Sequence, residues 1–117
     1  MAFLAEQSGK SVETAKVAEE TDVPPVYLRK IFQSLARSGL VRTTAGSGGG
    51  VCLTSKPADV TLKDIIEAVE GPISLSDCIE HSSVCPRSAR CKTNRCLSGI
   101  QTRIQQEFSS HTLADLM

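Results

Sequence analysis

Aromatic residues are scarce in this 117-residue chain, which has no Trp, one Tyr and three Phe. A core must therefore be built mainly from Leu, Ile, Val and Ala, and that composition favours helices. Apolar residues make up 40% of the chain, which is enough for one modest core, and the length fits one domain.

The chain also lacks an excess of charge of either sign, because 13 Lys and Arg residues balance 13 Asp and Glu residues. Any contact with DNA must therefore come from local clustering of charge. No apolar run approaches the ~20 residues of a membrane span, and the opening MAFLAEQSGK lacks the basic start of a secretory signal. We predict a cytoplasmic protein, and a reducing compartment argues against a disulfide framework. No Ser/His/Asp or paired-carboxylate arrangement indicates an enzyme.

Helix signals fill the first forty residues. Residues 2–8 read as the end of a helix closed by Gly9, so the first helix is predicted to be truncated. Ser11 is the predicted N-cap of a second helix, and a third helix begins near Pro25 and stops at Gly39. The apolar stripe of this third helix consists of Leu28, Ile31, Phe32 and Leu35. Two short helices joined by a tight turn have the dimensions of a helix-turn-helix.

A β-hairpin is predicted directly after these helices. Residues 40–43 and 51–54 have strand composition, and they flank the glycine-rich stretch 45–50. These glycines do not form a phosphate-binding loop of the nucleotide-binding kind, because no Lys-Ser/Thr pair and no helix follow them. A hairpin after a helix-turn-helix is the wing of a winged helix. The predicted fold class is mainly α with a small β-hairpin wing.

The second half of the chain contains two further predicted helices. Thr61 caps a helix that extends through Val69, with Leu62, Ile65, Ile66 and Val69 facing inward. A final helix covers residues 94–108, and its narrow apolar stripe consists of Cys96, Ile100, Ile104 and Phe108. This stripe favours a long C-terminal dimerisation helix over a helix that folds back on its own domain.

Four of the five cysteines lie in the polar stretch DCIEHSSVCPRSARCKTNRC, residues 77–96. Thiols that serve only in packing are usually scattered among apolar residues, so this stretch indicates metal or redox chemistry. The fifth, Cys52, lies on a predicted wing strand and is expected to be a core residue. The neighbouring cations Arg87, Arg90, Lys92 and Arg95 are expected to lower the pKa of the thiols.

Several stretches together resemble the Rrf2 family of winged-helix transcription regulators, which includes the IscR and NsrR iron–sulfur sensors. They are YLRKIFQSLARSGLVRTTAGSGGGVCL, the AVEGP at residues 68–72, the cysteine stretch and the closing TLADLM. They cover nearly the whole chain in the family's order. The resemblance implies a homodimer that binds double-stranded DNA at a palindromic operator. It also implies an iron–sulfur cluster, either 2Fe–2S or 4Fe–4S, held by three cysteines.

The resemblance carries the ligand role to Cys78, Cys85 and Cys91. The distance from Cys91 to the terminal motif at Thr112 matches that of the last ligand in relatives, whereas the distance from Cys96 does not. The intervening six and five residues are too many for a structural zinc knuckle and suit a loop around a larger cluster. Zinc and free redox thiols remain alternatives on spacing alone.

The chain departs from the family in three places. Relatives have a longer N-terminus rich in Arg and Lys. Some have a His ligand where this chain has Asn94, and many have Arg-Gly at the wing tip where this chain has Ala45-Gly46. His81 lies within the cysteine stretch and reads as a solvated loop residue more than as a ligand. An iron–sulfur interaction module that has lost DNA binding is therefore a further alternative.

The predicted DNA contacts lie on the third helix and in the hairpin. They are Val26, Arg29, Lys30, Gln33, Arg37, Arg42, Ser47, Gly48 and Gly49. Arg29 and Lys30 are placed to reach guanine edges, while Arg37 and Arg42 are placed to meet the backbone. The alternative is an ordinary solvated helix face, and the adjoining wing favours DNA.

The predicted domain organisation follows from these assignments. Residues 1–76 form the winged helix-turn-helix, residues 77–93 the cluster-binding loop, and residues 94–117 the dimerisation helix and tail. We expect cluster occupancy to set DNA affinity. The predicted function is a DNA-binding transcriptional regulator that senses iron, redox state or nitric oxide.

Overall fold

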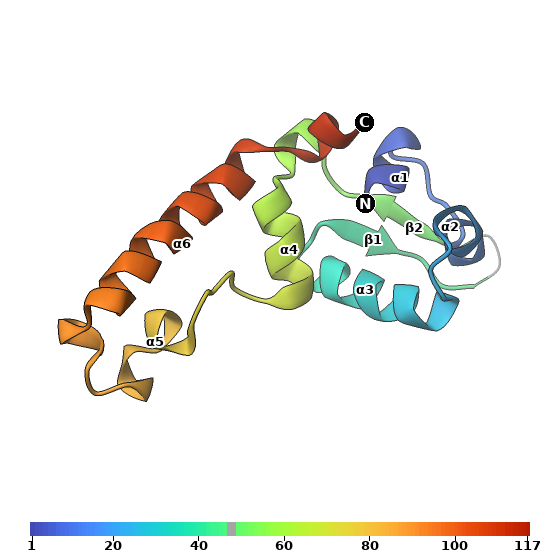
Figure 1. Ribbon diagram of the computed structural model, residues 1–117. Coiled ribbons are helices and arrows are strands. Elements are labelled where there is room, and N and C mark those ends of the chain that lie inside the picture. The colour runs from blue at the N-terminus through green and yellow to red at the C-terminus, as the bar shows by residue number, and fades with distance from the viewer. Residues whose placement is uncertain (47–48) are drawn as a thin grey trace.

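The computed structural model describes residues 1–46 and 49–117, apart from the side chain of Ser82. The helices are α1 (Ala2–Glu6), α2 (Thr14–Thr21), α3 (Pro25–Arg37), α4 (Leu62–Glu70), α5 (Asp77–Glu80) and α6 (Lys92–Ser110). Two antiparallel strands, β1 (Val41–Thr43) and β2 (Val51–Leu53), form the hairpin. Helices α2 and α3 precede this hairpin, as predicted for a winged helix-turn-helix (Figure 1).

Helix α3 forms where the sequence predicts it. Pro25 occupies its first turn, where a missing N–H costs nothing, and Gly39 follows its end with φ +75°. Leu28, Phe32 and Leu35 are buried, so the predicted apolar stripe faces the core. The opposite side of α3 is left to solvent.

The predicted N-cap Ser11 is wrong, because α2 begins at Thr14 with Glu13 as its N-cap. Val12 instead forms an antiparallel bridge with Val51, with N–O distances of 2.9 and 2.8 Å. Both valines are buried. The two hydrogen bonds and the burial of Val12 outweigh the local capping preference of Ser11. A Cβ at Gly50 would meet the Val12 carbonyl oxygen at 2.3 Å, so glycine permits this close approach.

The hairpin packs one side into the core. Val41 pairs with Leu53, Thr43 pairs with Val51, and the three apolar members of these pairs are buried. Cys52 is also buried, as predicted for a core residue. The wing is therefore anchored to the body by its strands.

Two reciprocal hydrogen bonds, a capping box, stabilise the N-terminus of helix α4. The Thr61 hydroxyl accepts from the Asp64 N–H at 3.1 Å, and the Asp64 carboxylate accepts from the Thr61 N–H at 3.0 Å. Ile65 and Val69 pack against the core that α3 lines. On another side α4 contacts α6, so it connects α3 with the C-terminal helix.

After α6 the chain returns to the winged helix. The Leu113 N–H donates to the Val60 carbonyl at 2.8 Å, and the Leu62 N–H donates to the His111 carbonyl at 2.9 Å. Leu113 is fully buried. The closing TLADLM thus fastens the end of α6 to the body (Figure 1).

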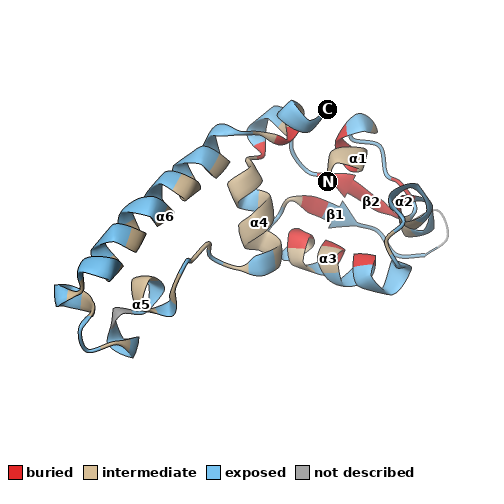
Figure 2. Ribbon diagram, in the orientation of Figure 1, coloured by how far each residue is buried: buried red, intermediate tan, exposed pale blue. Residues whose placement is uncertain are grey.

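The molecule is elongated, with extents of 57 × 26 × 23 Å and a radius of gyration of 17.5 Å. A compact domain of this length would have a radius of gyration of about 13 Å. Buried residues gather in the winged helix, whereas α5 and α6 form an arm without them (Figure 2). Within residues 1–46 and 49–117, no helix is both long and apolar enough to cross a membrane.

Candidate nucleic-acid interface and cysteine segment

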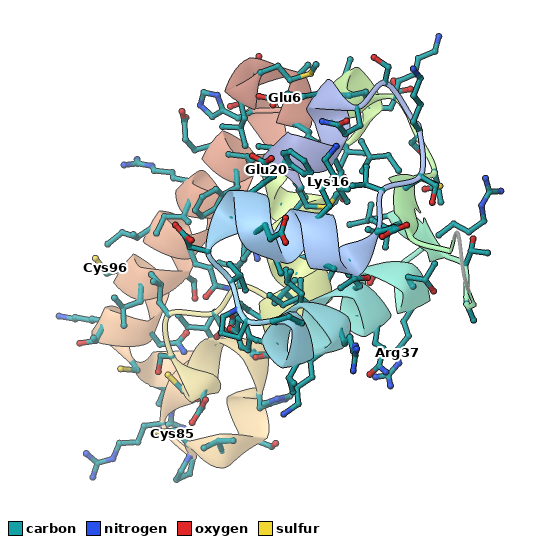
Figure 3. All side chains as sticks on the ribbon, turned by 90° about the vertical axis from the view of Figure 1, so that its right-hand side faces the viewer. Glu6, Lys16, Glu20, Arg37, Cys85 and Cys96 are labelled. Carbon is teal, nitrogen blue, oxygen red and sulfur yellow. The ribbon has the colours of Figure 1, made fainter. Side chains whose placement is uncertain are left out.

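Helix α3 presents all of its predicted DNA-contact residues to solvent. Burial of its apolar stripe turns the other side outward, and the exposed residues there are Val26, Arg29, Lys30, Gln33 and Arg37. The helix contains no acidic residue, so its three cations form a local positive surface. The net charge of the whole chain, which is zero, does not reveal this surface. Arg37 projects away from the body of the molecule in Figure 3.

Two apolar side chains at the start of α3 are strongly exposed. Val26 is 66% exposed and Tyr27 is 57% exposed. An exposed valine can meet a thymine methyl group, and a tyrosine can combine apolar contact with a hydrogen bond. Our sequence interpretation missed Tyr27 because it followed charge. The available signal was a lone aromatic residue in the first turn of a recognition helix.

The wing contributes Arg42 and Gly49 to the same end of the molecule. Arg42 is exposed on β1, with its guanidinium 3.9 Å from Cys52 Sγ. The Gly49 N–H donates to the Gly46 carbonyl at 3.0 Å, so this amide is used within the turn and is not free for phosphate. The predicted contacts Ser47 and Gly48 lie outside the described residues.

The cysteine segment consists of short helical pieces at the far end of the arm. Cys78 lies on α5, Cys85 between the 3-10 turns Ser82–Val84 and Ser88–Arg90, and Cys91 at the N-cap of α6. Cys96 lies on α6 and is exposed, in keeping with its predicted place on that helix. All five thiols are free.

Asn94 joins two of the three predicted ligands. Its side-chain amide donates to Cys78 Sγ at 3.4 Å and to the Cys78 carbonyl at 3.1 Å. Its backbone N–H donates to Cys91 Sγ at 3.4 Å. Ser76 Oγ lies 3.1 Å from Cys78 Sγ on the other side. Asn94 is therefore a hydrogen-bond donor to the thiols at the position where some relatives have a His ligand.

The Ser76 hydroxyl, and after it the Asn94 amide, lower the pKa of the Cys78 thiol below its ordinary value. The sequence predicted a lowered pKa from the neighbouring Arg and Lys side chains. For Cys78 that predicted cause is wrong, because hydrogen bonds and not cations are responsible. A thiol held this way has more thiolate character, which suits both metal ligation and nucleophilic chemistry.

The structure does not bring the three predicted ligands together as a formed metal site. Among the described residues, no three Cys, His, Asp or Glu side chains converge as a metal site. The hydrogen bonds recorded for residues 83–90 are all local, for example from Ser88 to the Cys85 carbonyl at 2.8 Å. Cys85 can therefore approach Cys78 and Cys91 without breaking a recorded tertiary hydrogen bond. Three thiols on a polar segment fit the chemistry of an iron–sulfur cluster.

Neither histidine is hydrogen-bonded to a thiol among the described residues. His81 is exposed at the end of α5. His111 Nε2 lies 2.9 Å from Glu107 Oε1, at the opposite end of α6.

Comparison with known proteins identifies the family. The family described as "Rrf2: Iron-dependent Transcriptional regulator" matches residues 1–117. The regulator IscR of Vibrio atlanticus is 30% identical over 118 residues, which cover 100% of this chain and 68% of that protein. The regulator CymR of Bacillus subtilis is 30% identical over 117 residues, which cover 99% of this chain and 80% of that protein.

Solved structures agree with the predicted fold class. The structure of CymR, the global cysteine regulator of B. subtilis, has a TM-score of 0.72 and 29% identity, covering 98% of this chain and 84% of that one. The structure of T. potens IscR has a TM-score of 0.67 and 26% identity, covering 98% and 75%. These relatives are transcription regulators, which confirms the prediction that the chain is not an enzyme. The chain belongs to the Rrf2 family of transcriptional regulators.

Proposed function

We propose that this protein is a cytoplasmic, homodimeric regulator that binds a palindromic DNA operator with an affinity set by a labile iron–sulfur cluster. The observation that carries the proposal is the path of one helix. Helix α6 has Cys91 as its N-cap, and Asn94 in its first turn donates to Cys78 Sγ. The other end of α6 leads into the tail that buries Leu113 in the winged helix. A change in the conformation of the cysteine segment can therefore be transmitted through α6 to the winged helix.

The DNA-binding surface combines α3 with the wing. The residues proposed to contact DNA are Val26, Arg29, Lys30, Gln33, Arg37, Arg42, Ser47 and Gly48. Arg29 and Lys30 project from the solvent side of α3 and reach guanine edges in the major groove, while Gln33 reads adenine or meets phosphate. Arg37 and Arg42 neutralise backbone phosphates.

The exposure of the arm supports the proposed dimerisation. Ile100 is 42% exposed on α6, and Cys96 one turn earlier is also exposed. Pairing of two such helices buries this face, and a two-fold dimer matches a palindromic operator. Residues 1–76 then serve as the DNA-binding unit, residues 77–93 as the cluster loop, and residues 94–117 as the dimerisation helix and tail.

Cys78, Cys85 and Cys91 are the proposed cluster ligands. A bound 2Fe–2S or 4Fe–4S cluster would supply sensitivity to iron, oxidants or nitric oxide. Two glutamines of α6 bind the backbone of the segment that leads directly into the ligand loop. The Leu75 N–H donates to Gln101 Oε1 at 2.9 Å, and Gln105 Nε2 donates to the Ile73 carbonyl at 3.3 Å. Ordering of the ligand segment therefore acts on α6, then on α4 and the recognition helix that α4 contacts.

The test is anaerobic purification followed by a visible absorption spectrum and counts of iron and acid-labile sulfide. A brown protein with matched iron and sulfide, both lost in Cys91→Ser and retained in the matched helix variant Cys96→Ser, is the expected result. A colourless protein would overturn the cluster assignment. If Cys85→Ser left DNA affinity unchanged with and without cluster loading, the coupling would be wrong.

A cluster-free thiol regulator is the second candidate. The lowered pKa of Cys78 favours it, because a thiolate is the reactive form toward oxidants. CymR, the relative in B. subtilis, is described as a cysteine regulator. Metal content separates the candidates, since the thiol regulator requires no iron and a zinc regulator would retain zinc after purification.

A further inference from the structure

A small cavity lies between the recognition helix, the start of α2 and the wing. Its volume is about 200 Å³. The polar lining comes from three elements and consists of Thr14, Arg29, Gln33, Thr43, Thr44 and Gly50. Only Arg29 and Gln33 belong to the DNA contacts assigned above. The three threonines have no assigned role.

Every polar side chain of this lining can donate a hydrogen bond, and none is a carboxylate. The donors are three hydroxyls, one amide and one guanidinium. In the part of the chain that the structure describes, none of these five side chains has a recorded hydrogen bond or ion pair to another residue. A concave site with one cation and unpartnered donors is suited to an anion with several acceptor oxygens.

The start of α2 adds to this positive character. Its N-cap Glu13 makes no side-chain cap, and its first turn contains no acidic residue. Among the backbone hydrogen bonds of residues 1–46 and 49–117, the first N–H groups of α2, at Thr14, Ala15 and Lys16, also have no recorded acceptor. Uncapped N–H groups and the helix dipole favour a negative charge beside Thr14.

We propose that this cavity binds one phosphodiester group of the DNA backbone beside the groove that α3 enters. The inference rests on the proposed DNA-binding function and adds Thr14, Thr43 and Thr44 to its contact residues. A phosphate offers only acceptors and carries a negative charge, whereas base edges offer both donors and acceptors. Every polar side chain of the lining can donate, and Arg29 adds a positive charge, so the lining favours phosphate. The bound phosphate fixes the angle between the recognition helix and the wing.

The test measures the affinity of the full-length protein for two duplexes, one selected by the protein from a random pool and one of unrelated sequence. The variants are Thr14→Ala, Thr43→Ala and Thr44→Ala, and fluorescence anisotropy is recorded over a range of salt concentrations. Thr43 and Thr44 are exposed, so these substitutions leave the fold intact. Thr21→Ala, at the other end of α2 with its hydroxyl bonded to the Val17 carbonyl, is the matched control.

Each cavity variant is expected to bind about fivefold to tenfold more weakly, equally for both duplexes. The dependence of log K on log salt is expected to stay unchanged, because a threonine releases no counterion. Arg37→Ala, at a proposed phosphate contact, in contrast reduces that slope by about one. Replacing the contacted phosphate by an uncharged methylphosphonate removes the difference between wild type and Thr43→Ala, and the same replacement elsewhere does not.

Wild-type affinity in all three threonine variants would overturn the inference and leave the proposed function standing. If the cavity bound inorganic phosphate in a titration while the variants kept full DNA affinity, it would be a site for free anions and the inference would again be wrong. A wild-type protein that bound neither duplex would overturn both the inference and the proposed function.

Discussion

The winged-helix body and the arm made by α5 and α6 are held together in different ways. Among the residues whose burial the structure describes, the buried ones lie between 4 and 60, except Leu113 of the tail (Figure 2). Helix α6 is 19 residues long and has none. Its recorded ties to the segment before α5 are side-chain amides on backbone groups, from Gln101 and Gln105. The buried core of the body therefore provides most of the stability of the fold. The arm, which is held by few contacts, can change its conformation at low cost in free energy.

This difference matches the two tasks proposed for the regions. A recognition helix must present fixed side chains to the groove, and a dense apolar core keeps it in place. A sensing segment must change with its occupant, and elements with few buried contacts open at low cost in free energy. Helix α4 lies between them, since it contacts both α3 and α6.

The largest expected effect is a difference between body and arm in how much a core-type substitution lowers the free energy of unfolding. Leu35→Ala removes a side chain that is 1% exposed and should lower the free energy of unfolding by about 2–5 kcal/mol. Leu97→Ala, a half-buried position of α6, should cost no more than about 1 kcal/mol. Urea unfolding followed by circular dichroism measures both. Equal losses would show that the arm shares the core's stability and that the contrast is wrong.

The second-largest effect is expected at the exposed apolar side of α6, which we propose is covered by a second copy of the chain. Ile100→Glu places a charge on the exposed apolar side of α6, and a buried unpaired charge in a helix pair is strongly unfavourable. We expect the protein to change from dimer to monomer in size-exclusion chromatography with light scattering. Thr102→Glu, exposed on another side of α6, is the control that should leave the dimer intact. A dimer that survives Ile100→Glu would place the interface elsewhere.

The body was also the more predictable region, because its signals are local. Pro25 marks the start of α3 and Gly39 follows its end. The Thr61–Asp64 cap fixes the start of α4 within four residues of sequence. Prediction failed at Ser11, where the deciding partner of Val12 is Val51, far along the chain. No local pattern shows that a later strand will take the backbone groups of an apparent helix start.

The cysteine segment was predictable in composition and not in contacts. Its cysteine spacing and its likeness to the Rrf2 family point to three thiols. That the Asn94 amide faces Cys78, sixteen residues earlier, depends on how α5 lies against α6. The threonines of the cavity beside α3 were missed for the same reason. Thr14 and Thr43 line one cavity only when the wing is folded beside α2.

The smallest expected effect tests how finely the arm is tuned. Asn94→Ala removes a donor to Cys78 Sγ, so the thiolate loses stabilisation and the pKa of Cys78 should rise. In the metal-free protein the rate of Cys78 alkylation at neutral pH should fall, and the rate-versus-pH profile should move to higher pH. Ser76→Ala should move it the same way and by more, since the Ser76 hydroxyl is the larger cause. Alkylation at Cys96, which has no such donors among the described residues, is the internal control. A profile for Cys78 that coincides with that of Cys96 before any substitution would show that the arm holds its thiols no differently from an exposed helix surface.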